Sequence, residues 1–263
     1  MTQFLSSVDA VVARRIEAGH AHSAMASVSG VAVERIGGGW AIFHEPRSPV
    51  TQAIGMGIQG DIEPDCLDRL EAFYHSHSSP CVIDLATLAD PNLVARIAER
   101  GYLVREISHV MARRIDAMPA DVGDPRTSVE AAGPGEFPMW MRMMLQGFAG
   151  DEEIPEEQMA IMAAGNPWPE AFFGVWEGNR VATAAMDVHA GLATFFGDAT
   201  LVGARGRGLQ IALIRHRLQR AAALGCDLAS ASVLPGSVSH RNYERAGFQL
   251  IYGRIQISRQ LSW

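Results

Sequence analysis

The chain has 263 residues, of which 48% are hydrophobic and 19% charged, and its formal net charge is −7. This composition is typical of a folded globular protein, and no stretch approaches the roughly 20 consecutive apolar residues of a membrane-spanning helix. The negative charge argues against nucleic-acid binding and favours basic partners. We therefore expect neither a nucleic-acid partner nor a membrane partner.

The amino-terminal segment MTQFLSSVDAVVARRIEAGH lacks the basic-then-apolar order of a secretory signal, so we expect a cytoplasmic protein. The three cysteines, Cys66, Cys81 and Cys226, are too few and too scattered for a disulfide framework or a CxxC metal site. We expect buried free thiols and no bound metal.

The first half of the chain alternates between predicted helices and strands. Apolar residues three or four apart predict helices, and short β-branched or aromatic runs predict strands. In chain order these are a helix at 6–26, strands at 31–36, 40–43 and 52–58, a helix at 65–75, a strand at 81–85, a helix at 92–100 and a strand at 102–115.

Residues 116–126, DAMPADVGDPR, contain two prolines and a glycine and predict a linker between a domain at 1–115 and a domain at 127–263. The second domain repeats the alternation of helices and strands. Helices are predicted at 137–148 and 154–164, strands at 172–176, 180–188 and 192–201, a long helix ending near 224, a strand at 228–233, a helix at 238–246 and a strand at 248–257.

The two halves share an internal pattern. ERGY at 99–102 and ERAGF at 244–248 each predict a helix that a glycine ends, followed by an aromatic residue that enters a strand. Duplication followed by divergence is the simplest account. We expect an α/β (α+β) fold of two tandem modules, each a mixed, mostly antiparallel sheet flanked by helices.

The glycine turn, residues 205–210 with the sequence RGRGLQ, separates a predicted strand from the long helix. Glycines allow backbone amides to approach a ligand closely, and a helix N-terminus favours a phosphate. Such turns also serve helix packing. In the following helix we expect Ile211, Ile214, Leu218 and Ala221 to face the core and Arg217 to point elsewhere.

The corresponding segment of the first half, QGDIEPD at 59–65, lacks this turn. Its three carboxylates would repel a phosphate, and its proline removes an amide donor. We therefore expect only the second half to bind an anionic cofactor.

With the order of elements, two motifs make residues 128–260 resemble the GNAT superfamily of acyl-CoA-dependent N-acetyltransferases. One is the family's Arg/Gln-x-x-Gly-x-Gly/Ala turn, matched by Arg205 and Gly208, with Gln210 in place of the usual small residue. The other is Tyr-x-x-x-Gly-Phe, which is similar to the segment from Tyr243 to Phe248.

The resemblance implies the residues that bind coenzyme A. Backbone amides of the glycine turn would hold the pyrophosphate, and the exposed main chain of the preceding strand would pair with the pantetheine amides. Ser239 and Asn242 lie one helical turn or less from Tyr243 and could touch the pantetheine arm. The implied cofactor residues are Ala199, Thr200, Leu201, Val202, Arg205, Gly206, Arg207, Gly208, Leu209, Gln210, Ser239 and Asn242.

The resemblance also places Tyr243 beside the thioester sulfur, where a phenol can donate a proton to the departing thiolate. Tyr243 is therefore the candidate general acid, although it could simply pack its helix against the sheet. Asp198 is the candidate general base because strand alternation puts it on the same face as Thr200. A structural carboxylate is the alternative for Asp198, and Asp187 and Glu177 are other candidates for the base.

The function implied is an N-acetyltransferase that uses acetyl-CoA as a co-substrate, with no metal, and a primary amine of a small molecule or peptide as acceptor. The amine would attack the thioester directly. The alternative is a non-catalytic acyl-CoA-binding regulatory module. The acceptor's identity and the oligomeric state stay open, with a homodimer among the alternatives.

Overall fold

The computed structural model describes residues 7–46, 48–58, 62–116, 124–133, 135–156 and 170–260. The chain divides into two compact units. Unit 1 comprises Met1–Val110 and Leu250–Trp263, and unit 2 comprises Met111–Gln249.

Unit 1 is a sheet with helices on both faces. Its strands follow the order β1-β2-β3-β4-β11-β5, in which β3 and β4 are parallel and β4 and β11 are antiparallel. Its elements are α1 (Ser7–Ala26), β1 (Ala32–Ile36), β2 (Gly39–Phe43), β3 (Gln52–Ile54), α2 (Cys66–Ser76), β4 (Cys81–Ala86), α3 (Pro91–Glu99), β5 (Leu103–Arg114) and β11 (Gln249–Arg259).

Unit 2 has the strand order β10-β9-β8-β7-β6, with the end of β5 beside β10. Strands β9 and β10 are parallel, whereas β6 to β9 form antiparallel neighbours. Its elements are β6 (Thr127–Ala131), α4 (Phe137–Ala149), β7 (Glu170–Trp176), β8 (Asn179–His189), β9 (Leu192–Thr200), a 3-10 turn η1 (Val202–Ala204), α6 (Leu209–Ala223), β10 (Leu228–Val233) and α7 (Val238–Arg245).

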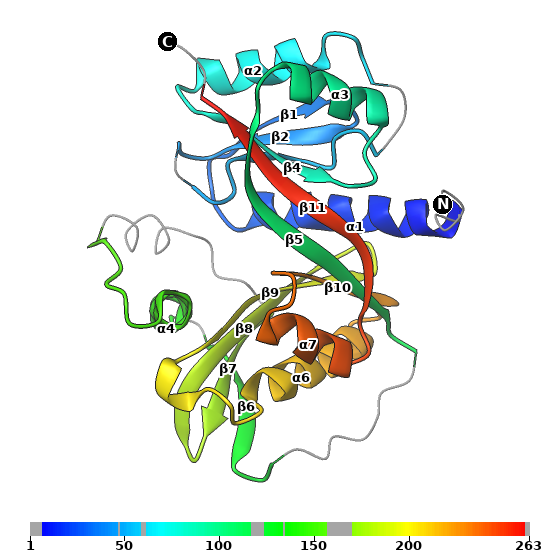
Figure 1. The fold of residues 1–263 in the computed structure, drawn as a ribbon. Coiled ribbons are helices and arrows are strands. Elements are labelled where there is room, and N and C mark those ends of the chain that lie inside the picture. The colour runs from blue at the N-terminus through cyan, green and yellow to red at the C-terminus, as the bar shows by residue number, and fades with distance from the viewer. Residues whose placement is uncertain are drawn as a thin grey trace. The chain divides into compact units, whose positions relative to one another are not determined.

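The internal repeat predicted from the sequence is confirmed by this topology. In each unit a hairpin is followed by a strand, a helix, a parallel strand and a second helix. Helices α2 and α3 cover one face of the first sheet and α1 the other, just as α6 and α7 cover one face of the second sheet and α4 the other (Figure 1). In each unit, one helix connects the two strands of the parallel pair: α2 connects β3 to β4, and α6 connects β9 to β10.

The structure differs from the expected elements in three places, the first being the strand expected at 52–58, which ends at Ile54. Strand β6 has no clear signal in the sequence because its five residues, TSVEA, show little apolar alternation. The last strand, β11, was expected in the second domain but pairs with β4 of unit 1, where Ile255 and Ile257 join the core under α2 and α3. Residue alternation predicts a strand but does not say which sheet receives it.

Some expectations fall on residues that the structure does not describe. Most of the predicted helix at 154–164 and most of the linker at 116–126 lie outside the described residues. The described part of the 59–65 segment places Glu63, Pro64 and Asp65 just before α2, as Gly208 precedes α6 in unit 2. The absence of a cofactor site in unit 1 stays a prediction.

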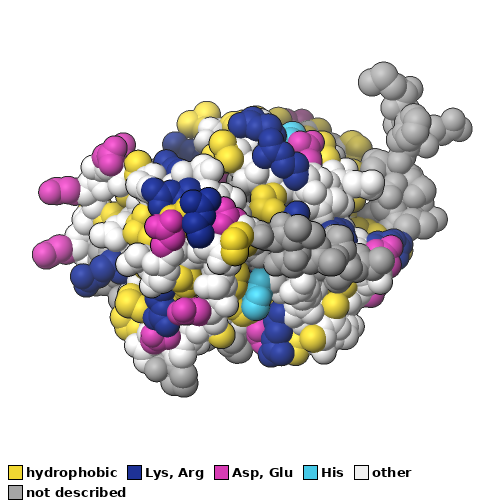
Figure 2. Space-filling model, turned by 90° about the horizontal axis from the view of Figure 1, so that it is seen from below, with side chains coloured by type: hydrophobic (Ala, Val, Ile, Leu, Met, Phe, Trp, Pro, Cys, Tyr) yellow, Lys and Arg dark blue, Asp and Glu magenta, His cyan; other side chains and the backbone are white. Residues whose placement is uncertain are grey.

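Surface and composition features add three findings. In the face shown in Figure 2, acidic and basic side chains are interspersed, with apolar side chains scattered between them. Among the described helices none is long and apolar enough to cross a membrane. Within the described ranges, no group of three potential metal-binding side chains occurs, and the three cysteines are buried and unpaired with one another.

Helix α4 packs on β9 at very short range, which fixes one side of the later site. A Cβ atom added to Gly147 of α4 would stand 2.7 Å from the Cβ atom of Ala199 on β9. Only a residue without a side chain permits this approach. The end of α4 is therefore held directly against the strand that leads into the glycine turn.

Unit 1 contains a buried cluster of charged side chains. Arg254 of β11 donates from Nε to Oε1 of Glu17 on α1 at 2.8 Å, and the Tyr252 hydroxyl donates to the same oxygen. Asp84 of β4 lies 3.7 Å from the Arg254 guanidinium. Burial raises the pKa of Asp84 from its ordinary value of 3.8 to about 6, and Glu17 adds to the rise while Arg254 opposes it.

This cluster predicts a pH dependence of stability. The folded chain binds the Asp84 proton more tightly than the unfolded chain, so its contribution to stability falls as the pH rises from about 4 to 6. We expect urea denaturation to show that wild type loses roughly 3 kcal/mol relative to Asp84→Asn over this range, because each pKa unit corresponds to about 1.4 kcal/mol. Parallel pH profiles of the two proteins would contradict the assignment.

Candidate functional site

The two parallel strands β9 and β10 separate partway along their length. Their pairing runs from Leu192 opposite Leu228 to Phe195 opposite Ala231, although β9 continues to Thr200. The other edge of β9 pairs with β8, with a register shift near Gly197, whose φ is +68°. Beyond Phe195, the edge of β9 that faces β10 is therefore not paired with it and is available for hydrogen bonds to an extended ligand.

The glycine turn follows this unpaired edge. Gly206 and Gly208 have φ values of +78° and +77°, a conformation that side chains with a Cβ atom rarely adopt. Gly208 is the N-cap of α6, and no side chain caps it. The first amide N–H groups of α6, which have no partner within the helix, are consequently available to an anion.

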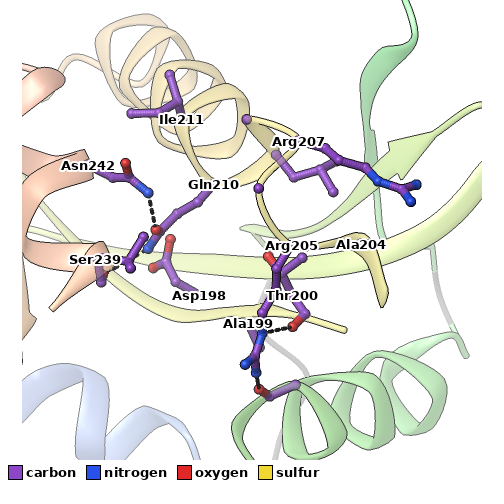
Figure 3. Close-up of a pocket in the computed structure, with 15 residues that line it drawn as sticks. Asp198, Ala199, Thr200, Ala204, Arg205, Arg207, Gln210, Ile211, Ser239 and Asn242 are labelled. Atoms are coloured by element: carbon purple, nitrogen blue, oxygen red, sulfur yellow. Dashed lines mark hydrogen bonds between the residues drawn. The ribbon is translucent and has the colours of Figure 1, made fainter. Parts of the chain in front are cut away.

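The unpaired edge of β9, the glycine turn and helix α7 line a cavity of about 510 Å³ (Figure 3). Asp198 lines it, and so do all predicted cofactor residues except Leu201 and Val202. The Leu201 amide instead donates to the Val181 carbonyl at 3.0 Å, and Val202 begins the 3-10 turn. The predicted residues that the structure brings together are Ala199, Thr200, Arg205, Gly206, Arg207, Gly208, Leu209, Gln210, Ser239 and Asn242.

The two arginines of the glycine turn have different surroundings. Arg205 folds back and donates from Nη2 to the Gly147 carbonyl at 2.8 Å and from Nε to the Thr200 carbonyl at 3.2 Å. It thereby ties the end of α4 to the end of β9. Arg207 is exposed, with its guanidinium carbon 5.2 Å from the ring centre of Trp176. Its charge is therefore accessible at the edge of the cavity.

Gln210 connects the two helices that border the cavity. Its Nε2 donates to the Ser239 hydroxyl at 2.8 Å, and its Oε1 accepts from the Asn242 amide at 2.7 Å. These bonds turn the long side chain from α6 toward α7 (Figure 3). The departure from a small residue at this position therefore has a structural use, because it fixes α7 relative to the glycine turn.

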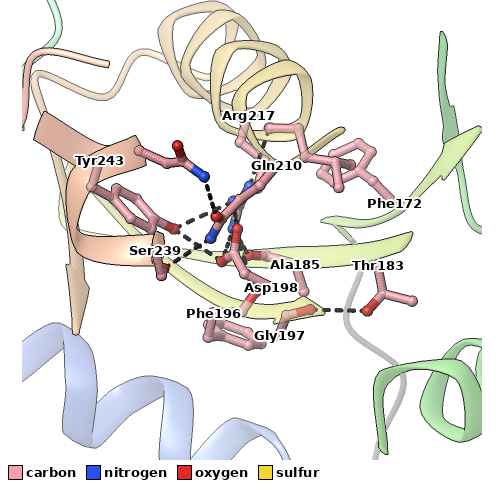
Figure 4. A network of polar contacts seen from close by, with 12 residues as sticks. Phe172, Thr183, Ala185, Phe196, Gly197, Asp198, Gln210, Arg217, Ser239 and Tyr243 are labelled. Atoms are coloured by element: carbon pink, nitrogen blue, oxygen red, sulfur yellow. Dashed lines mark hydrogen bonds and ion pairs between the residues drawn. The ribbon is translucent and has the colours of Figure 1, made fainter. Parts of the chain in front are cut away.

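Asp198, Arg217 and Tyr243 form a polar network beneath the cavity (Figure 4). Nη1 of Arg217 donates to Oδ2 of Asp198 at 3.0 Å, and Nη2 donates to Oδ1. The Tyr243 hydroxyl donates to Oδ2 of Asp198 at 2.9 Å. Both carboxylate oxygens are therefore occupied by donors from α6 and α7.

Arg217 is completely buried, which contradicts the expectation that it points away from the core. Its guanidinium also donates to the Ala185 carbonyl at 3.0 Å and stacks 4.5 Å from the ring centre of Phe195. A signal was present in the sequence, since Arg217 lies four residues before Ala221 and three after Ile214, within the apolar stripe. Arg217 was expected to point outward because its side chain is charged, although its position lies within the apolar stripe.

Tyr243 and Asp198 form a hydrogen bond that was not predicted from the sequence, and they differ in their access to the cavity. The cavity-lining residues that the structure describes include Asp198 and not Tyr243, which is 1% exposed. Burial, with the nearby Asp198 carboxylate, raises the pKa of Tyr243 well above its ordinary value, although Arg217 opposes this rise. The phenol thus stays protonated, and the acid and base roles stay predictions.

Comparison with solved structures assigns the fold. A GCN5-related N-acetyltransferase from Kribbella flavida superposes with a TM-score of 0.74 at 17% identity, over 95% of this chain and 96% of that one. A tandem GNAT protein from the clavulanic acid biosynthesis pathway matches at 12% identity and a TM-score of 0.57, over 98% and 90% of the two chains. An acetyltransferase from the GNAT family of Colwellia psychrerythraea matches at 12% and 0.52, over 97% and 98%.

The chain therefore has a GNAT-like fold, and one of its structural neighbours is itself a tandem protein. Protein-family profiles and curated proteins give no match to the sequence.

The polar network predicts an asymmetric response to mutation. Replacing Asp198 by Asn leaves the buried Arg217 without a counter-charge, so we expect Asp198→Asn to lower the free energy of unfolding by about 3 kcal/mol. The double variant Asp198→Asn with Arg217→Met should be more stable than Asp198→Asn alone, as measured by urea denaturation. A single variant as stable as wild type would show that the pair is dispensable for stability.

Proposed function

We propose that the protein is an N-acetyltransferase that transfers an acetyl group from acetyl-CoA to a primary amine. One observation carries this proposal: an uncapped, glycine-led helix N-terminus adjoins the unpaired edge of β9 in a single cavity. The first feature suits a pyrophosphate, and the second suits a linear ligand with amide groups. Coenzyme A combines both.

The residues that would hold coenzyme A follow from this arrangement. Amides of the glycine turn, residues 205–210, would bind the pyrophosphate, and the exposed side chain of Arg207 would add positive charge. The main chain of Ala199 and Thr200 would pair with the pantetheine amides. Because the Leu201 amide is already bonded to β8, Leu201 and Val202 have a smaller part in the proposed site than the sequence indicated.

The reaction would proceed by direct attack of the neutral amine on the thioester carbon. A carbon–nitrogen bond forms, the carbon–sulfur bond breaks, and one proton passes from the amine to a base while the thiolate takes up another. Asp198 is the proposed base and Tyr243 the proposed acid. Proton transfer to Asp198 has to compete with its ion pair to Arg217, and the Tyr243 hydroxyl has to turn from Asp198 toward the sulfur.

A glycine substitution tests the cofactor site. Alanine at position 208 would have to adopt a φ of +77°, which costs about 1–2 kcal/mol, so the turn is expected to relax and displace its amides. We expect Gly208→Ala to weaken coenzyme A binding at least about 10-fold, measured by isothermal titration calorimetry.

Gly178 provides a matched control for this variant. It has a φ of +79° in the β7–β8 turn, and, as at Gly208, no atom lies within 4 Å of an added Cβ. Gly178→Ala should therefore carry similar backbone strain while leaving coenzyme A affinity unchanged. Equal losses of affinity in the two variants would mean that the effect is general strain and not a local site.

A second variant separates catalysis from binding. Thiol release from acetyl-CoA is measured with pooled small amines, amino acids and peptides. We expect Tyr243→Phe to lower turnover at least about 10-fold and to leave coenzyme A affinity nearly intact, because the acid would be lost while the cavity lining is kept.

The same measurement distinguishes the alternative function, a non-catalytic acyl-CoA-binding module. That interpretation gains support if wild type binds acetyl-CoA tightly but releases no thiol with any amine. The enzyme proposal fails in that case, while the assignment of the cofactor site survives.

A further inference from the structure

Three polar side chains join α6 and α7 across the cavity wall (Figure 3). Nε2 of Gln210 donates to the Ser239 hydroxyl at 2.8 Å, and the Asn242 amide donates to Oε1 of Gln210 at 2.7 Å. We call this pair of hydrogen bonds the amide bridge. All three residues line the cavity, so the amide bridge connects two walls of the candidate cofactor site.

One end of the amide bridge belongs to the first turn of α6. Gly208 is the N-cap of this helix, so Gln210 is its second residue. The Ala212 amide donates to the Gly208 carbonyl at 3.1 Å, and the amides before it have no partner within the helix. Gln210 therefore presents its main-chain N–H to the proposed pyrophosphate and its side chain to α7.

The other end belongs to the helix that carries Tyr243. Helix α7 has eight residues, all of them described, and among these only Tyr243 is buried. A helix of this length is not stable by itself, so its orientation depends on side-chain contacts. Asn242 directly precedes Tyr243, and Ser239 lies one helical turn before it. The amide bridge thus restrains the rotation of α7 and, with it, the direction of the phenol.

The amide bridge adds little to the stability of the fold. Gln210, Ser239 and Asn242 are half-buried, so water competes for their donors and acceptors and the net gain from each hydrogen bond is small. The small residue that the family motif usually has at position 210 could not reach α7. A requirement for the orientation of α7 therefore accounts for the glutamine better than stability does.

We infer that Gln210 is a positioning residue, which couples the glycine turn that would bind the pyrophosphate to the phenol that would protonate the thiolate. This inference rests on the proposed function and adds to it a side chain that takes no part in proton transfer. A displacement of a reacting group by about 1 Å lowers a rate by on the order of 100-fold. Loss of the amide bridge should therefore reduce kcat, whereas coenzyme A affinity, which depends on main-chain amides, should change little.

The main test is Gln210→Met, which keeps an unbranched side chain of similar length and removes both hydrogen bonds. The full-length protein is used. Thiol release from acetyl-CoA with the best amine of the pooled panel gives kcat, and isothermal titration calorimetry gives the dissociation constant of coenzyme A. We expect kcat to fall at least about 10-fold while the dissociation constant stays nearly unchanged.

Gln210→Glu should show the opposite separation. Its carboxylate can accept hydrogen bonds from both the Asn242 amide and the Ser239 hydroxyl, so the bridge is kept. Its negative charge, however, lies next to the proposed pyrophosphate site. We expect this variant to recover most of the kcat lost in Gln210→Met and to weaken coenzyme A binding. A merely structural glutamine would not produce these opposite effects on turnover and affinity.

Two double variants test the route through which Gln210 acts. In Tyr243→Phe protein, the addition of Gln210→Met should lower kcat little further, because the group to be positioned is already gone. Ser239→Ala should lower kcat by itself. Combined with Gln210→Met, it should give a loss smaller than the product of the two single losses, because both variants break the same bridge.

Gln219→Met is the matched control. Gln219 lies on the same helix, and its side chain is exposed. The same substitution there should leave kcat and coenzyme A affinity as in wild type. An equal loss of kcat in Gln219→Met and Gln210→Met would overturn the inference.

The remaining outcomes separate the inference from the proposed function. Wild-type kcat in Gln210→Met, or a loss that fully multiplies with that of Tyr243→Phe, overturns the inference and leaves the proposed function standing. A wild-type protein that binds no acetyl-CoA, or releases no thiol with any amine, overturns the proposed enzyme and the inference with it.

Discussion

A fully buried guanidinium organises the candidate site. Arg217 stands on α6, the helix that the glycine turn begins, and it reaches Asp198 on β9 and the Ala185 carbonyl on β8. A buried charge is tolerated only when its donors are satisfied and a counter-charge is present. These contacts fix the distance between α6 and the sheet at the point where the pairing of β9 with β10 ends. Asp198 in turn accepts a hydrogen bond from the hydroxyl of Tyr243 on α7. The cavity walls are therefore coupled through one side chain.

Much of the fold could be predicted from the sequence because its signals are local. Gly206 and Gly208 lie in an irregular turn before α6, and α7 ends at Arg245, just before Gly247 with its positive φ. Each of these depends on a few neighbouring residues, as do the hairpins and the amphipathic helices. The repeat followed from the same signals occurring twice, and the topology bears it out. Ten of the twelve cofactor residues that the family resemblance implied line one cavity.

The remaining features depend on contacts between distant residues. Arg217 was assigned outward because charged side chains are seldom buried, and only a partner nineteen positions away, Asp198, makes its burial tolerable. Gln210 departs from the usual small residue of the turn, and the reason is its bonds to Ser239 and Asn242 on another helix. Strand β11 likewise has a clear local pattern and an unexpected neighbour.

The pairing of β11 with β4 has a consequence for how the chain is made. Unit 1 contains the first 110 residues, yet its sheet is completed by residues that follow α7. During synthesis the edge of β4 has no β11 to pair with until the residues after α7 have left the ribosome. A chain truncated at the linker would lack β11, so this edge of β4 would have no such partner. The sheet of unit 1 therefore includes residues from both sides of the boundary that the sequence predicts.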